Sequence, residues 1–222
     1  MLFALGTPVA FAALVVSFLL GLTVRAVAVR LTARSLGLAD RKEGIMPNPR
    51  DDIDPFGAVG AALGGMGWGK MISVDEVPRW RGRGRAAAVF AAGPLSCVIL
   101  GELLFAVYKV LYPDNILSLI GPGEILGGLS GPFTEVVLLS LAAGLVSFGL
   151  LALIPIPPLD GFGILYHALR RPGPSMQWMR LWFEEKNVGV LILLICSLFP
   201  FGYPFLLRIV NALGLVFVRV WG

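Results

Sequence analysis

The sequence predicts an all-α polytopic membrane protein, and three observations support this: a strongly apolar composition, apolar segments of membrane-spanning length, and basic residues gathered beside them. Hydrophobic residues make up 57% of the 222 residues and charged residues only 14%. Soluble domains carry about 25% charged residues, and a mean hydropathy of +0.83 is also unusual for them. Because no long polar linker or repeat interrupts the chain, we expect a single membrane domain over residues 1–222.

Segment lengths predict about four transmembrane helices, because a helix needs about 20 apolar residues to cross a bilayer. The segments that meet this requirement are 8–34, 86–112, 132–154 and 187–221. The last contains the sequence FPFGYP at 199–204, whose prolines break the helical pattern. A kinked helix and a hairpin of two short helices both satisfy it. No cation precedes the first segment, so we expect a retained helix rather than a cleaved signal peptide.

A glycine-rich segment over residues 56–74 predicts a re-entrant piece of chain. Six residues between 57 and 69 are glycine, and each glycine costs a helix about 1 kcal/mol relative to alanine. Irregular backbone at membrane depth needs cover from neighbouring protein. We therefore expect one or two re-entrant or broken segments besides the spans.

The basic residues predict the orientation in the membrane. The run RWRGRGR abuts the second span, and the positive-inside rule places such a cluster in the cytoplasm. On this basis the N-terminus is outside and three loops are cytoplasmic: 38–55, 75–85 and 156–186. The cluster is also a candidate contact for lipids or a partner protein, and it consists of Arg79, Arg81, Arg83 and Arg85. A cluster in this position does not predict nucleic-acid binding.

Four motifs occur in an order that resembles a known family. They are NPRDDIDPFG at 48–57, GWGK at 67–70, AAGPLSC at 91–97 and LIPIPPLDGFGIL at 153–165. In order and approximate spacing they resemble the site-2 protease family of intramembrane zinc metalloproteases, in its compact form without appended domains. The resemblance implies a site-2-protease-like core and, from the breadth of the family, a bacterial cytoplasmic membrane.

The resemblance also implies where a zinc site would lie. In the family, two histidines of an HExxH motif and the aspartate of an LDG motif hold zinc, and the HExxH glutamate is the general base. Asp160 matches the aspartate. Aligning the family's following LG with Leu36-Gly37 places Arg25 and Val29 where the histidines belong, and Ala26 where the glutamate belongs. The chain therefore resembles a degenerate member of the family.

Other positions of the old substrate cleft are partly kept. Cys97 stands in place of the asparagine of the family's GPxxN motif, while Pro157, Pro158 and Gly161 match the family. Residues 1–39 contain no His, Asp, Glu or Cys, so no shift of the alignment supplies a zinc ligand or a base. We expect a pseudoprotease that has no cofactor and no catalytic residues.

Asp160 needs a partner if no metal binds it, because an uncompensated carboxylate at membrane depth costs roughly 3 kcal/mol. A guanidinium binds a carboxylate through two parallel hydrogen bonds. We hypothesise that Arg25 pairs with Asp160 in place of the metal and bridges the first and third spans. The alternative is that Arg25 reaches the cytoplasmic interface while Asp160 caps a turn or is protonated.

Two further ionisable residues have several interpretations. Glu102 lies within the second span, where a carboxylate is a functional candidate by default. Three explanations remain open for it: contact with a partner subunit, pairing with Lys109 two turns later, and exposure near the outer interface. His167 is the only histidine, and we expect it to be solvated or interfacial because it lies in the basic sequence YHALRR.

Three functions follow from these interpretations. The first is a catalytically inactive site-2-protease-like protein that serves as an accessory, structural or assembly subunit of a larger membrane complex. The second is a non-cleaving binder or regulator of transmembrane helices that uses the old substrate cleft. The third is a zinc metalloprotease with relocated ligands. The expected partners are membrane lipids and other membrane protein subunits, with no small-molecule substrate.

Overall fold

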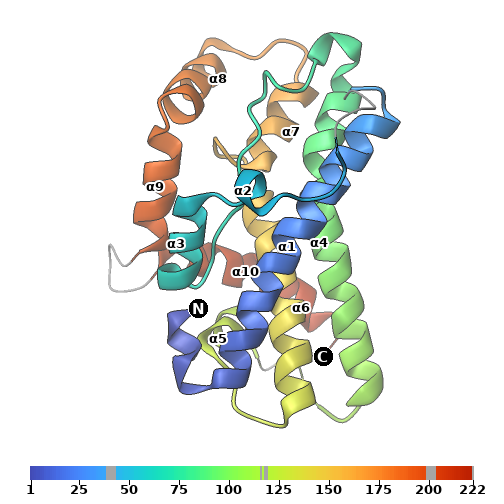
Figure 1. The fold of residues 1–222 in the computed structure, drawn as a ribbon, viewed down its shortest axis with the longest axis vertical. Coiled ribbons are helices and arrows are strands. Elements are labelled where there is room, and N and C mark those ends of the chain that lie inside the picture. The colour runs from blue at the N-terminus through green and yellow to red at the C-terminus, as the bar shows by residue number, and fades with distance from the viewer. Residues whose placement is uncertain (39–43, 116, 118–119, 199–203, 222) are drawn as a thin grey trace.

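The computed structural model describes residues 1–38, 44–115, 117, 120–198 and 204–221. Within these ranges the chain is helical and contains no strand, apart from one isolated bridge between Ile53 and Gly69. Figure 1 shows the helices gathered around three long ones that run side by side.

Three of the described helices are long and apolar enough to cross a membrane: α1 (Pro8–Ser35), α4 (Arg83–Leu111) and α6 (Phe133–Ala152). At 1.5 Å per residue, α6 is about 30 Å long, which is the thickness of a bilayer's hydrocarbon core. The helices α1 and α4 have 28 and 29 residues, so each extends about 13 Å further than α6.

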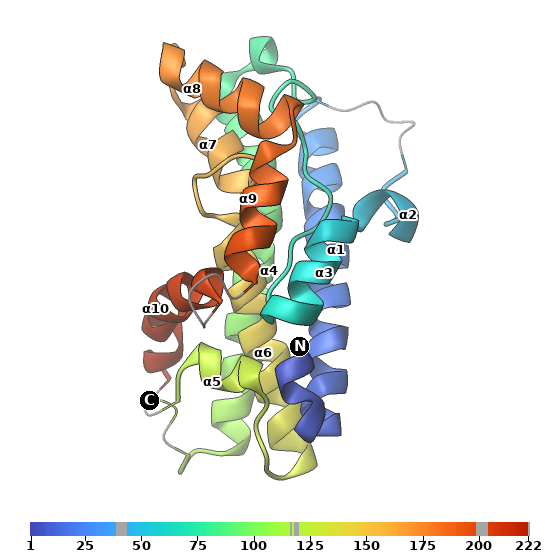
Figure 2. The ribbon, with the colours of Figure 1, turned by 90° about the vertical axis from the view of Figure 1, so that its left-hand side faces the viewer.

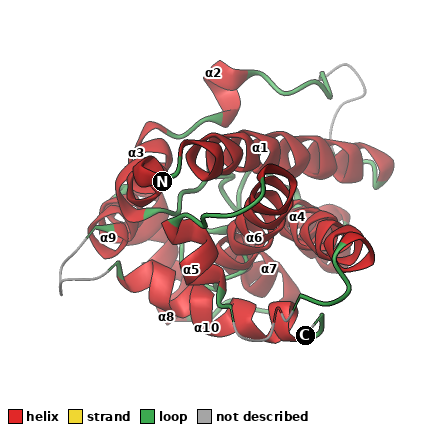
Figure 3. Cartoon of the chain, turned by 90° about the horizontal axis from the view of Figure 1, so that it is seen from below, coloured by secondary structure: helices red, strands yellow, loops and turns green. Residues whose placement is uncertain are grey.

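Close packing around α6 holds these helices together. Every residue of α6 from 145 to 152 is buried, and Figure 3 shows the helix between α1 and α10 (Phe205–Arg219). Small residues allow the approach: a Cβ on Gly101 of α4 would lie 2.6 Å from Val146, and one on Gly144 would lie 2.1 Å from the hydroxyl of Ser17 on α1. Contacts between small residues are typical of helix packing in membranes.

The glycine-rich segment forms a short helix followed by irregular backbone. Asp54 accepts hydrogen bonds from the backbone of Phe56 and Gly57, which starts α3 (Pro55–Gly64). Gly65 has a positive φ of 79° and ends the helix. The irregular residues 65–69 are buried, which agrees with the expected shelter from neighbours.

The expected fourth span is two shorter helices in the described chain, α9 (Val188–Ser197) and α10. The expected break at 199–204 lies outside the described residues except for Pro204. The α9 helix packs against α3, since a Cβ on Gly64 would lie 2.1 Å from the carbonyl oxygen of Ser197. Each of these two helices has 10 residues, and Figure 2 shows them side by side.

The remaining elements are short and are divided between the two halves of the bundle. At the end where α1 and α6 begin are the 3₁₀ turn η1 (Leu2–Gly6) and α5 (Pro122–Gly127). The other elements belong to the opposite half: α2 (Pro49–Asp52), the 3₁₀ turn η2 (Arg79–Arg81), α7 (Asp160–Ala168), α8 (Pro174–Met179) and the π-helical turn η4 (Arg180–Glu185).

Candidate functional site

The structure brings Arg25 of α1 and Asp160 of α7 into direct contact. Nε of Arg25 donates to Oδ2 of Asp160 over 2.6 Å, and Nη2 donates to Oδ1 over 2.5 Å. The side chains are 10% and 2% exposed, respectively. This is a buried bidentate ion pair, the arrangement in which Arg and a carboxylate bind most strongly.

Asp160 owes its position to the proline-rich sequence after α6. Pro155, Pro157 and Pro158 cannot continue the helix, so the chain leaves α6 at Ala152 and starts α7 only at Asp160. A carboxylate in the first turn of a helix interacts favourably with the helix dipole. Gly161 allows the tight return, because a Cβ there would lie 2.1 Å from the carbonyl oxygen of Leu153.

The glycine-rich segment and α4 also lie against the side chain of Arg25. Its Nη1 donates to the carbonyl oxygen of Lys70 over 2.9 Å, which ties the glycine-rich segment to the ion pair. Gly93 of α4 lies against the aliphatic part, where a Cβ would be 2.6 Å from Cγ of Arg25. Cys97 is buried one helical turn further along α4 and its thiol lies 3.4 Å from the carbonyl oxygen of Gly21.

A cavity of about 600 Å³ begins beside this pair. Arg25, Ala26 and Val29 of α1 form one wall, so both other positions matched to the metal-binding motif lie at its edge. Residues 44–52 and 70–77 contribute to the other walls. The first of these segments is held over the cavity by Arg30, which lies 2.5 Å from Asp52 and donates to the carbonyl oxygen of Met46 over 3.0 Å.

The residues at this position do not fit a catalytic zinc ion. Such an ion needs three protein ligands of N, S or O type and an open position for water. Both oxygens of Asp160 already accept hydrogen bonds from Arg25, whose fixed positive charge opposes a cation at the same carboxylate. Among the described residues, no group of three or more His, Cys, Asp or Glu side chains could hold a metal.

Pro158, another position matched to the family's motifs, lies close to the pair. With Asp160, Arg25 and Trp68 it lines a small gap between α1 and α7. Pro157 is buried and packs closely against Gly189 of α9. A Cβ on Gly189 would lie only 2.7 Å from the carbonyl oxygen of Pro157. The bond between the two prolines is cis.

Two of the four clustered arginines bind backbone carbonyl groups. Arg79 donates to the carbonyl oxygens of Tyr166 and Arg170 over 3.3 and 3.0 Å, and also to that of Leu169. Arg81 donates to the carbonyl oxygen of Gly37 over 2.6 Å. These carbonyls lie at the ends of α7 and α1, where cations are favourable. The side chains of Arg83 and Arg85 are exposed, and the structure gives them no partner among the described residues.

Glu102 binds the C-terminal end of the chain. Its Oε2 accepts a hydrogen bond from Nε1 of Trp221 over 2.8 Å, while Oε1 is buried and has no partner among the described residues. Lys109 instead donates to the carbonyl oxygen of Asn115 over 3.0 Å. Trp221, 119 residues away in sequence, was not indicated by any sequence pattern.

We expected a solvated or interfacial histidine, and the solvated alternative was wrong. His167 is 1% exposed, its Nε2 lies 3.2 Å from the carbonyl oxygen of Val74, and its ring stacks on Phe90 with 5.3 Å between centroids. Burial lowers the pKa of His167. The sequence did contain a signal: His167 follows Asp160 by seven residues and Gly163 by four, which places all three on the inner face of α7.

Comparison with known proteins gives one informative match. A Bacillus subtilis (strain 168) protein named "Putative zinc metalloprotease YwhC" is 27% identical over 203 residues, which cover 90% of this chain and 86% of that protein. No protein-family model matches the chain, and no solved structure matches it. Over most of its length, then, the chain is similar to a protein named as a metalloprotease, and the bacterial relative supports a bacterial origin.

Proposed function

We propose that this chain is a non-hydrolytic relative of the site-2 proteases, in which Arg25 takes the structural place of the metal. The observation that carries this proposal is the buried pair of Arg25 and Asp160 at the position matched to the zinc site. The chain has neither the imidazoles nor the glutamate of that site, and its guanidinium neutralises the one carboxylate that remains.

The cavity beside the pair supports a binding function rather than a purely structural one. It has about 600 Å³ of space and is lined both by apolar side chains such as Val29 and Val77 and by charged ones such as Arg30 and Lys70. Binding sites of 300–1,000 Å³ with a few placed polar groups are typical of proteins that hold a ligand. An unwound segment of another membrane protein fits this mixture of surfaces.

In this proposal the protein acts as an accessory subunit, and the cavity holds a segment of its partner without cutting it. The mean hydropathy of +0.83 and the three long apolar helices favour a partner in the same membrane. A stable complex that does not use the cavity is the second candidate, favoured by the exposed arginines Arg83 and Arg85.

Photo-crosslinking in native membranes tests the proposal. A benzophenone amino acid at Ala33 or Val77, both in the cavity wall, is expected to crosslink one membrane protein at its full mass. The same group at Leu103, which is 58% exposed on α4, is the control and is expected to give no such product. Crosslinks from Leu103 alone would favour the second candidate.

Two measurements test whether the protein hydrolyses its partner: the zinc content of the purified chain and the mass of the crosslinked partner. Purified protein is expected to contain well below one zinc ion per chain after dialysis. A full equivalent of zinc, or a crosslinked partner that is shortened only when this chain is present, would overturn the proposal. The outcome is independent of which partner is captured.

A further inference from the structure

The helix α8 and the turn η4 form a short arm. It lies at the same end of the bundle as Arg83, the first residue of α4. The arm, residues 174–186, comes after α7 and leads into α9, and Figure 2 shows it running across the top of α9. One side of it is held by the rest of the protein. Met176 and Met179 pack against the cluster around Phe90 and Phe162, and Nη1 of Arg180 lies 2.8 and 2.9 Å from the carboxylate oxygens of Asp75.

The opposite side of the arm is apolar and uncovered. Trp178, Leu181 and Trp182 are 56%, 42% and 39% exposed. Residues spaced by three and four positions share one face of a helix. The two indole rings lie 6.0 Å apart, so they form one continuous aromatic surface. Exposed tryptophans of this kind are enriched where a membrane meets water.

The depth of the arm follows from α9. The first large apolar side chain exposed on that helix is Leu191, at 55%, and Ile195 follows one turn later at 48%. Asn187, which directly follows the arm, precedes Leu191 by four residues, or about 6 Å along the helix. The headgroup layer of a bilayer is about 5–7 Å thick on each side. The arm therefore lies at the level of the headgroups when Leu191 lies in hydrocarbon.

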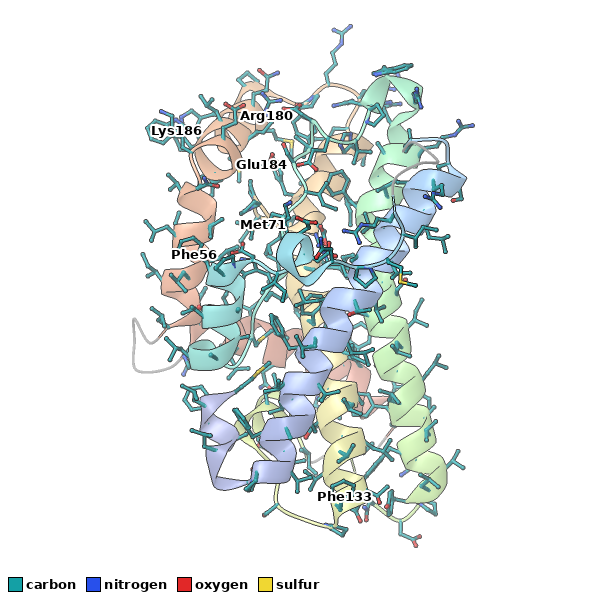
Figure 4. The ribbon with its side chains drawn as sticks, in the orientation of Figure 1. Phe56, Met71, Phe133, Arg180, Glu184 and Lys186 are labelled. Atoms are coloured by element: carbon teal, nitrogen blue, oxygen red, sulfur yellow. The ribbon has the colours of Figure 1, made fainter. Side chains whose placement is uncertain are left out.

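The charge of the arm and of the loop before it is positive. Four cations, Arg170, Arg171, Arg180 and Lys186, stand against two anions, Glu184 and Glu185. Nζ of Lys186 lies 4.2 Å from the centre of the Trp182 ring, and Figure 4 shows Lys186 on the outer side of the arm. Such a surface is complementary to anionic phospholipid headgroups.

We propose that the arm is an interfacial anchor, with Trp178, Leu181 and Trp182 inserted at the boundary of the acyl chains and with Arg170, Arg171 and Lys186 bound to anionic headgroups. The anchor has a consequence for the cavity. The arm also holds residues 73–75 through Arg180 and through the hydrogen bond from Ser73 to Glu184, next to the cavity wall formed by residues 70–72. Lipid contact at the arm thus fixes the position of one wall.

Fluorescence of the full chain in lipid nanodiscs tests the insertion. The emission difference between the chain and its W178F/W182F variant isolates the two indoles. This difference is expected to be quenched by phospholipids brominated near the top of the acyl chains, and to be shielded from aqueous acrylamide. Indoles that stay open to acrylamide and insensitive to bromine would overturn the proposal, as would shielding that needs an added soluble protein.

A second measurement tests the charge. In nanodiscs of phosphatidylcholine mixed with phosphatidylglycerol, the chain is expected to gather phosphatidylglycerol around it. An R170Q/R171Q/K186Q variant is expected to lose at least fivefold of this enrichment, since each cation near an anionic surface contributes about fivefold. R219Q, which removes an exposed cation from α10, is the control. Equal enrichment in all three proteins would overturn the anionic part of the proposal.

Discussion

The guanidinium of Arg25 and the carboxylate of Asp160 face each other through two hydrogen bonds of 2.6 and 2.5 Å, although 135 residues separate them in sequence. Nη1 of the same guanidinium binds the carbonyl oxygen of Lys70. One side chain therefore connects α1, α7 and the glycine-rich segment, and its removal is expected to loosen all three.

Replacing Arg25 alone is expected to be strongly destabilising. R25M leaves the Asp160 carboxylate buried with no countercharge, which costs about 3–5 kcal/mol. The melting temperature in detergent should fall by roughly 10 °C. The matched control is R25M/D160L, in which both charges are absent and most of the lost stability should return. If R25M melts at the same temperature as the unchanged chain, the pair contributes nothing to stability.

Introducing the family's metal-binding motif at the matched positions is expected to create a zinc site. In the R25H/A26E/V29H variant, two imidazoles spaced by four residues share one face of α1 with Asp160 nearby, and three such ligands suffice for zinc. We expect about one zinc ion per chain by elemental analysis. R25H/A26E, which lacks the second imidazole, should retain much less. Absence of zinc in the triple variant would show that Arg25, Val29 and Asp160 are not arranged as the resemblance implies.

The contact between the arm and residues 73–75 is expected to weaken as the pH rises. Burial raises the pKa of Glu184 to about 7 from 4.5. The folded chain therefore holds this proton more tightly than the unfolded chain, and stability falls as pH rises from about 4.5 to about 7. Hydrogen exchange at residues 73–75 should become faster between about pH 4.5 and pH 7 in the unchanged chain. In E184Q this part of the pH dependence should be absent. E185Q, at an exposed neighbouring carboxylate, should keep it.

Arg79 and Arg83 are expected to contribute differently to the stability of the fold. R79Q removes the donor to three carbonyl groups after and within α7, and hydrogen bonds from charged groups contribute about 1.5–3 kcal/mol each. Its exposure reduces this, so we expect a loss of about 1–2 kcal/mol and faster hydrogen exchange at residues 166–170. R83Q, in the same run of sequence, should leave both unchanged. Equal effects would mean that both act only through charge.

The three long helices and the pairing of Arg25 with Asp160 could be predicted from the sequence, but for different reasons. Apolar length alone indicates the three long helices, because a bilayer requires it. The pairing of Arg25 with Asp160 could be proposed only because the motif order placed both at one site. Neither inference needed knowledge of side-chain packing.

Contacts made by unpatterned residues could not be predicted in this way. The charges of Arg79 and Arg81 indicate a side of the membrane, but their carbonyl partners depend on where α7 and α1 end. For Glu102 the sequence left a partner subunit, Lys109 and exposure at the outer interface open, whereas the packing of the C-terminal end supplies Trp221. His167 looked polar by its neighbours, although the fold buries it against Phe90.

A cation that is part of the polypeptide cannot dissociate. The bridge between α1 and α7 forms from the chain's own side chains and does not vary with the supply of transition metals in the cell, nor can a chelator extract it. The contact between α1 and α7 is therefore expected to be unchanged when cells are starved of transition metals.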